Sequence, residues 1–231
     1  MSNIYIGKGG KEYRYHENFN DTDKDLVIIS SDDIAFRVDS FILQAHSSVF
    51  RSMLSINNSE NNDVHLDHSH QALEMYLSAL NGYELKLKCY HWKSFKEGIE
   101  LCNLYDTPFI GTKMLSQVTP IDLFGDHIGH ELFVLASTFN DILTACRIIS
   151  TCGANRACYA KAADEFWTLD EWDGSHLDRL PSRWIWAYVR AHTERTRKLD
   201  IKSTWDDIST RFRKLLLPVS GYRICSIENI S

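Results

Sequence analysis

The amino-acid sequence predicts an α+β fold, in which a small β-sheet is flanked by a cluster of helices and is followed by an all-helical region. Two observations lead to this prediction. The stretch from Asp25 to Leu54 places two strand patterns and two short helix patterns within thirty residues. From Pro120 onward, apolar residues recur only at helical spacing. Helices as short as the first two do not form alone in water, so they must pack on the neighbouring strands.

The two strand patterns of this stretch predict a β-hairpin. Leu26 to Ile29 is a β-branched apolar run, and Ile34 to Val38 alternates apolar with polar residues, as a half-buried strand does. The polar residues Ser30 to Asp33 between them have the composition of a turn. Residues 1–24, by contrast, have glycine-rich turns and no sustained period. We expect a flexible leader there, with one short strand from Lys11 to Tyr15.

Two helices follow the hairpin, and each begins with a residue that can cap it. Ser40 is expected to cap a helix whose apolar face contains Phe41, Ile42 and Ala45, and Ser47 a second helix. The apolar positions of that second helix are Val49, Phe50, Met53 and Leu54. Further along the chain we expect a strand at 63–66, a helix capped by Ser69, an edge strand within 84–90, and helices at 92–105 and 109–117.

The remainder of the chain predicts helices alone. Apolar stripes place helices at 128–139 and 142–149, joined as an αα-hairpin at Asn140-Asp141, and three more at 156–169, 181–199 and 204–217. The last of them carries a capping box between Thr204 and Asp207. We therefore expect three parts: a leader (1–24), an α+β domain (25–118) and a helical region (119–231).

The order of residues in the first of these patterns resembles the opening of a BTB/POZ domain. The matching residues are Asp25, Leu26 to Ile29, Phe36, Val38, Leu43, Ala45, Ser47, Val49, Phe50, Met53 and Leu54. The resemblance continues, more weakly, to about residue 118, and the helical region resembles the carboxy-terminal extension of fungal members. Asp39-Ser40 stands where the family has His-Lys or His-Arg, so the basic residue that the family places near its first-strand acid is absent.

The resemblance implies a non-enzymatic protein–protein interaction module that acts as a dimerising scaffold or adaptor. It places the dimer interface at Asp25, Phe41, Ile42, Ala45 and Val49. A two-fold contact needs one self-complementary apolar patch, and Phe41 and Ile42 are suited to its centre.

The family also includes substrate adaptors of cullin-3 ubiquitin ligases, which is our alternative. The corresponding surface would contain Asn58, Glu60, Tyr105 and Phe109. Cullin-binding members carry a hydrophobic residue two positions before the acid, where this chain has Asn58. The resemblance therefore implies a weakened anchor at this surface.

The composition and charge of the chain argue against several other classes of function. The formal net charge is -6 without a long acidic block, which argues against a nucleic-acid surface. Neither a signal peptide nor a 20-residue apolar span is recognisable, so we expect a cytoplasmic or nuclear protein without a membrane partner. The six cysteines form no CxxC pair and are expected to be reduced thiols. We expect no cofactor, no small-molecule substrate and no catalytic residues, since no catalytic motif is present.

Two features invite other interpretations. His65, His68 and His70 lie beside Asp67 and contain ligand types that zinc prefers, which makes a metal protein or an enzyme a second alternative. A strand-to-helix corner would point these side chains in different directions, so we expect no metal site. Residues 176–214 contain ten Lys or Arg against five Asp or Glu, interleaved with tryptophans. The helical spacing of Trp184, Tyr188 and Ala191 predicts a buried face instead.

Overall fold

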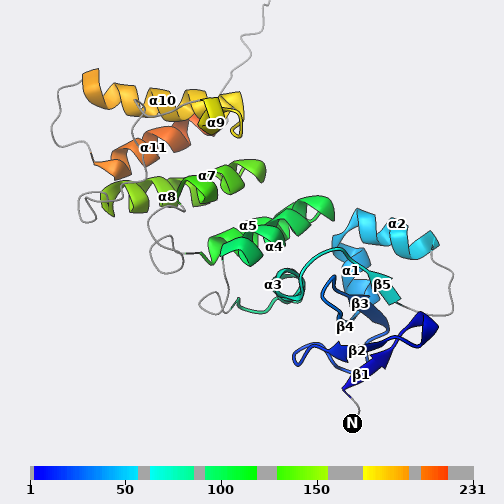
Figure 1. The fold of residues 1–231 in the computed structure, drawn as a ribbon. Coiled ribbons are helices and arrows are strands. Elements are labelled where there is room, and N and C mark those ends of the chain that lie inside the picture. Colours follow the sequence, from blue (N-terminus) through cyan, green and yellow to red (C-terminus); the bar gives the residue numbers. More distant parts are fainter. Residues whose placement is uncertain are drawn as a thin grey trace, which may run out of the picture. The chain divides into compact units, whose positions relative to one another are not determined.

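The computed structural model describes residues 3–56, 63–85, 92–118, 129–155, 174–197 and 204–217, and the account that follows concerns these residues. The chain divides into two compact units, residues 1–125 and 126–231 (Figure 1). The first unit contains a sheet and helices, and the described residues of the second unit form helices.

The first unit contains a mixed five-stranded sheet with strand order β1-β2-β4-β3-β5. The central strands β3 and β4 form the predicted antiparallel hairpin, in which Ile28 lies opposite Phe36. β5 runs parallel to β3, β2 runs parallel to β4, and β1 is antiparallel to β2. The strands are β1 (Ile4–Ile6), β2 (Glu12–Tyr15), β3 (Leu26–Ile29), β4 (Ile34–Val38) and β5 (Asp63–His65).

The helices of the first unit begin near the predicted caps. Ser69 caps α3 by accepting a hydrogen bond from the Ala72 N–H at 3.3 Å. Ser47 is fully buried and accepts one from the Phe50 N–H at 3.0 Å. The first helix differs from the prediction, because Asp39 and not Ser40 is its cap residue. The helices are α1 (Ser40–His46), α2 (Ser48–Ile56), α3 (His70–Leu80), α4 (Trp92–Leu104) and α5 (Pro108–Ser116), with a short 3-10 turn, η1 (Lys8–Gly10).

The amino-terminal residues differ from the expected flexible leader. β1 and β2 join the sheet, and Tyr13 and Tyr15 are buried against Ile29 and Ala35. Figure 1 shows these two strands on the side of β3 and β4 away from α1 and α2. The physical reason is that β3 and β4 have a second apolar face, which the tyrosines cover. A run as short as Glu12–Tyr15 gives too few alternations for its sequence alone to reveal this role.

Two predicted elements fall wholly or mostly outside the described residues. The helix at 156–169 lies there, as does most of the strand within 84–90; Glu84 and Leu85 themselves are not in a strand. The other predicted elements of the first unit are present within a few residues of their expected ends.

The second unit packs around an aromatic core. The ring of Phe133 lies 5.4 Å from Trp184, 5.7 Å from Tyr188 and 5.6 Å from Phe212, measured between centroids. Asn140 adopts a positive φ of 51° at the turn of the predicted αα-hairpin. The Thr204–Asp207 capping box is also present. The helices are α7 (Gly129–Thr138), α8 (Ile142–Asn155), α9 (Gly174–Leu177), α10 (Ser182–Arg197) and α11 (Trp205–Leu216).

The packing of Tyr15 makes the role of the amino-terminal strands testable. Tyr15→Ala is expected to lower the free energy of unfolding by about 3 kcal/mol, because it removes a buried ring from the second sheet face. Equilibrium unfolding in urea, followed by circular dichroism, measures this change. The control is Glu12→Ala on the same strand, whose side chain is exposed and whose loss should change stability by less than about 0.5 kcal/mol. Equal stability of the two variants would support a flexible leader instead.

Candidate interaction surface

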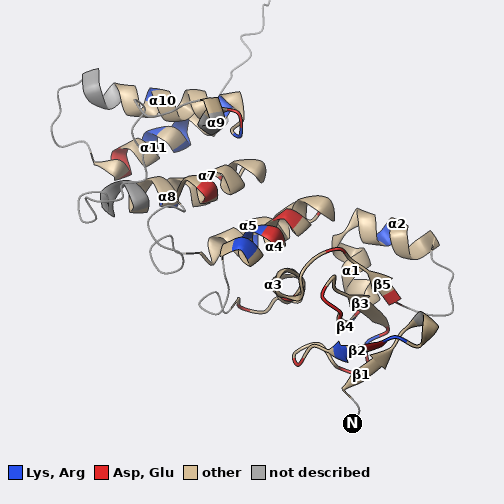
Figure 2. Ribbon diagram, in the orientation of Figure 1, with Lys and Arg blue, Asp and Glu red and all other residues tan. Residues whose placement is uncertain are grey.

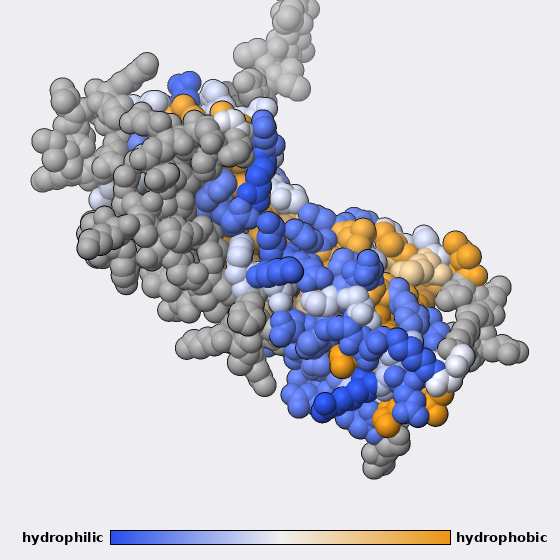
Figure 3. Space-filling model, viewed as in Figure 1, coloured by the Kyte–Doolittle hydropathy of each residue, from blue (hydrophilic) through white to orange (hydrophobic). Residues whose placement is uncertain are grey.

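The strongest candidate site is the outer surface of α1 and α2. α1 contains no Lys, Arg, Asp or Glu, and α2 contains only Arg51 (Figure 2). Phe41 on α1 is 76% exposed, and Ile56 at the end of α2 is 81% exposed. Figure 3 shows hydrophobic side chains over α2. Two short helices thus present a nearly uncharged surface with large apolar side chains, which is typical of a protein contact.

The structure brings most of the predicted interface residues to this surface. Phe41 and Ala45 are exposed one turn apart on α1, and Val49 is exposed at the start of α2. Ile42 is half-buried. Ile56 was not among the predicted interface residues, although it lies seven residues after Val49, a spacing that places both on one helix face.

Two carboxylates fix the amino-terminal end of α1. Asp39 Oδ1 accepts hydrogen bonds from the N–H groups of Phe41 and Ile42, at 2.9 and 3.4 Å. Asp25 accepts from the Ser40 N–H at 2.8 Å and from the Ser40 hydroxyl at 2.6 Å. The first three N–H groups of the helix are therefore satisfied, and the negative charges lie at its positive end.

This arrangement explains the absence of the basic residue expected near Asp25. Ser40 occupies that region and donates to Asp25, which therefore acts as a helix cap. Partial burial alone would raise the pKa of Asp25. The hydrogen bonds from the Ser40 hydroxyl and N–H outweigh burial and hold the pKa of this carboxyl below its ordinary value.

The bend between α1 and α2 is held by side chains that contact the backbone. Arg51 donates to the Gln44 carbonyl from Nε at 3.2 Å and from Nη2 at 2.9 Å. The buried Ser47 hydroxyl donates to the Tyr105 carbonyl at 2.5 Å, which ties the bend to the end of α4. The apolar surface therefore rests on a pair of helices whose ends are fixed.

The residues predicted for a cullin-type surface differ in their exposure. Tyr105 is only 6% exposed, and its ring stacks on Phe50 with centroids 4.4 Å apart. Tyr105 is therefore a core residue, and its expected place on a binding surface was wrong. Phe109 is 74% exposed in the first turn of α5. Asn58 and Glu60 lie outside the described residues.

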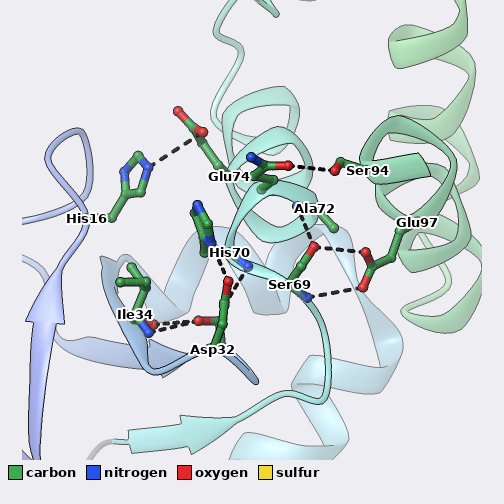
Figure 4. A network of polar contacts seen from close by, with 11 residues as sticks. His16, Asp32, Ile34, Ser69, His70, Ala72, Glu74, Ser94 and Glu97 are labelled. Atoms are coloured by element: carbon green, nitrogen blue, oxygen red, sulfur yellow. Dashed lines mark hydrogen bonds and ion pairs between the residues drawn. The ribbon is translucent and has the colours of Figure 1, made fainter. Parts of the chain in front are cut away.

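The three clustered histidines do not converge. The Nδ1 atom of His70 contacts Asp32 Oδ2 (Figure 4), and His68 Nδ1 lies 3.5 Å from Glu97 Oε1. The ring of His65 meets Tyr13 edge-on, with centroids 5.8 Å apart. Within the described ranges, no group of three or more His, Cys, Asp or Glu side chains is arranged to hold a metal ion.

The polar contacts in Figure 4 connect the start of α3 to its neighbours. Glu97 on α4 accepts from the Ser69 hydroxyl at 2.8 Å, and Asp32 in the β3–β4 turn accepts from the His70 N–H at 2.9 Å. Partial burial tends to raise the pKa of Asp32, but hydrogen bonds from His70 and Ser30 keep this pKa below its usual value. The network thus fastens the start of α3 to the sheet and to α4.

Within the described residues, Cys102 and Cys146 are free thiols, and the predicted aromatic face of α10 is part of the packing of the second unit. Burial raises the pKa of Cys102 to about 12 and also raises the pKa of Cys146, so neither thiol is poised as a nucleophile. The predicted buried face of Trp184, Tyr188 and Ala191 on α10 is confirmed. Those two rings are therefore unavailable for stacking on nucleic-acid bases.

The fold and its exposed apolar surface define a class, that of α+β protein–protein interaction modules. Comparison with protein families makes the assignment specific: the model of the BTB/POZ domain matches residues 15–118. The chain thus contains a BTB/POZ domain, and the match begins at the last residue of β2, ten residues before the predicted start of the α+β domain at Asp25. No curated protein matches the sequence. No helix among the described residues has the length and apolar character needed to cross a membrane.

The cap of α1 leads to a prediction about pH. Because the pKa of Asp25 is lower in the folded state, its stabilising effect is present above the ordinary aspartate pKa of about 3.9. The effect is lost as the pH falls through the folded-state pKa. Asp25→Asn should therefore cost about 1 kcal/mol at pH 7 and progressively less in acid. Urea unfolding at pH 7 and at about pH 2.5 measures both values.

The matched control is Asp23→Asn, which changes an exposed carboxylate near Asp25 that lies outside the cap of α1. It should have little effect at either pH. A loss of stability in Asp25→Asn that is the same at both values would contradict the charge-dependent cap.

Proposed function

We propose that this chain is a dimerising scaffold or adaptor. Its BTB/POZ domain contacts a second copy through the α1–α2 surface, and its helical region, residues 119–231, binds another protein. The observation that carries the proposal is the exposure of Phe41, 76% of which is accessible on a helix without charged residues. Burying one such side chain contributes roughly 1.5–3 kcal/mol of favourable free energy, so contact with a partner at this position would be stabilising.

The geometry suits a two-fold contact. In such a contact the same patch meets its own copy, so a compact apolar patch is self-complementary while a charged one is not. Phe41, Ile42 and Ala45 supply the apolar centre, and Asp25 lies at its edge, beside Ser40. Because Asp25, Asp39 and Arg51 already fix the helix ends, association orders little backbone. We place this activity in the cytoplasm or nucleus, where reducing conditions preserve thiols such as Cys102.

The dimer is tested by Phe41→Asp. The variant removes the central apolar side chain and would place two like charges near the two-fold axis, so the mass in light scattering at micromolar concentration should fall from dimer to monomer. Leu143→Asp is the matched control, because it changes a similarly exposed apolar residue in the helical unit. A wild-type chain that is monomeric in this range, or a Phe41→Asp variant with the wild-type mass, would refute the proposal.

A second candidate function is that of substrate adaptor for a cullin-3 ubiquitin ligase. The observation in its favour is the exposed pair Leu104 and Phe109, which flank the corner between α4 and α5. The Ser48 hydroxyl donates to Asp106 Oδ2 at 2.7 Å, which fixes this corner beside α2. The weak point of this candidate is Asn58, a polar residue at the position of the family's hydrophobic anchor.

Binding of purified cullin-3 distinguishes the outcomes. If this candidate holds, Phe109→Ala should weaken binding by about thirtyfold, as loss of a hot-spot aromatic does, and Asn58→Leu should strengthen it by at least about tenfold. Titration calorimetry on the full chain measures both effects. Failure of the wild type to bind, combined with binding by Asn58→Leu, would reject the adaptor role for the natural sequence.

A further inference from the structure

The first strand presents a hydrogen-bonding edge. β1 lies at the end of the strand order, and within the part of the chain that the structure describes no strand pairs with its outer side. The Asn3 carbonyl accepts from the Tyr15 N–H at 3.0 Å, and the Gly7 N–H donates to the Lys11 carbonyl at 2.9 Å. Since hydrogen bonding alternates along an antiparallel strand, the backbone groups of Ile4 and Ile6 point away from β2.

The side chains on this edge are also apolar and accessible. Ile4 is 47% exposed and Ile6 is 65% exposed, and both project from the same face of β1. Figure 3 shows hydrophobic atoms over β1, next to the amino-terminal end of the chain. On the other face, Tyr5 points inward and donates to Asp63 Oδ2 at 3.0 Å. Edge strands of natural proteins usually carry a charge or a proline that discourages pairing, and β1 has neither.

The sequence of the edge is complementary to itself. If two copies of β1 pair antiparallel about a two-fold axis at Tyr5, the free backbone groups of Ile4 meet those of Ile6 in the other copy. This register forms roughly four backbone hydrogen bonds and gathers the exposed isoleucines of both copies into one apolar cluster. None of the three residues of β1 carries a charge, so no like charges face each other in this register.

We propose that β1 is a second self-association surface, which pairs edge to edge with β1 of another copy of this chain. The contact is distinct from the α1–α2 surface, because it uses the opposite layer of the BTB/POZ unit and main-chain hydrogen bonds. A three-residue edge buries much less than the roughly 1,200 Å² of a stable interface, so the pairing is weak and concentration-dependent.

A chain with two isologous contacts can form assemblies larger than a dimer. If the α1–α2 dimer of the proposed function also forms, each dimer carries two β1 edges and can add further dimers at both ends. The product is a chain of dimers that grows with concentration. This consequence rests on the proposed function, whereas pairing of β1 does not.

Sedimentation equilibrium of the full chain from micromolar to millimolar concentration tests the inference. If the α1–α2 dimer forms, the wild-type mass should rise beyond that of the dimer; if it does not, the mass should rise from monomer towards dimer. Ile6→Pro removes an N–H that faces outward and leaves the ladder between β1 and β2 intact, so it should weaken this step by at least about tenfold. A double variant, Ile4→Lys with Ile6→Lys, should do the same through repulsion of like charges. Near-ultraviolet circular dichroism of the tyrosine cluster verifies that the strands remain folded.

The two self-contacts are distinguished by combining variants. The Phe41→Asp variant should still form a weak dimer through β1, and adding Ile6→Pro to it should abolish that dimer. The Ile6→Pro variant alone should form the α1–α2 dimer and no larger species. If Phe41→Asp has no effect while Ile6→Pro removes all association, the proposed function fails and β1 pairing stands. A Phe41→Asp variant that stays monomeric up to millimolar concentration, or β1 variants that associate as the wild type does, would overturn the β1 proposal. Ile4→Val with Ile6→Val, which preserves both edge and apolarity, is the control.

Discussion

The structure of the first unit depends on the burial of the β3–β4 hairpin from both sides. Ile28 and Phe36 are fully buried on one face, and Ile29 and Ala35 are fully buried on the other. A hairpin alone is marginally stable in water, so each face needs a cover. The rings of His16 and Phe19, which follow β2, pack on Phe36 on one face, and the tyrosines of β1 and β2 cover the other. A segment that would otherwise be a tail is thereby required for the fold.

The same constraint shapes the surface that is available for binding. The inward residues of α1 and α2, such as Leu43 and Phe50, are buried in the core, and their exposed residues include the large apolar side chains Phe41, Val49 and Ile56. Because Asp25, Asp39 and Ser47 satisfy the backbone where these helices begin, that apolar surface is held on a fixed frame. Covering the second sheet face likewise leaves β1 at the edge, with the backbone groups of Ile4 and Ile6 directed outward. Both proposed contacts thus follow from how the hairpin is buried.

Much of this protein could be predicted from its sequence. The hairpin, the caps at Ser47 and Ser69, and the buried face of α10 follow from spacings of one to four residues, which a linear pattern records directly. The BTB/POZ resemblance followed from the same local order and is matched by the family model over residues 15–118. The exposure of Phe41 and Ala45 did not follow from the apolar pattern, which placed both on the apolar face of their helix. It was expected only from the BTB/POZ resemblance, and it arises because α1 buries Leu43 instead.

The sequence by itself determined the local elements, their order and the family of the first unit. Only the tertiary structure decided which residues change role through contacts distant in the chain. Tyr13 and Tyr15 are core residues because they pack on the apolar side chains of Ile29 and Ala35, and Tyr105 is buried because its ring stacks on Phe50. Asp25 became a helix cap because Ser40, fifteen residues away, reaches it after the hairpin closes. Such roles depend on which faces meet in space, and a pattern of neighbouring residues does not contain that information.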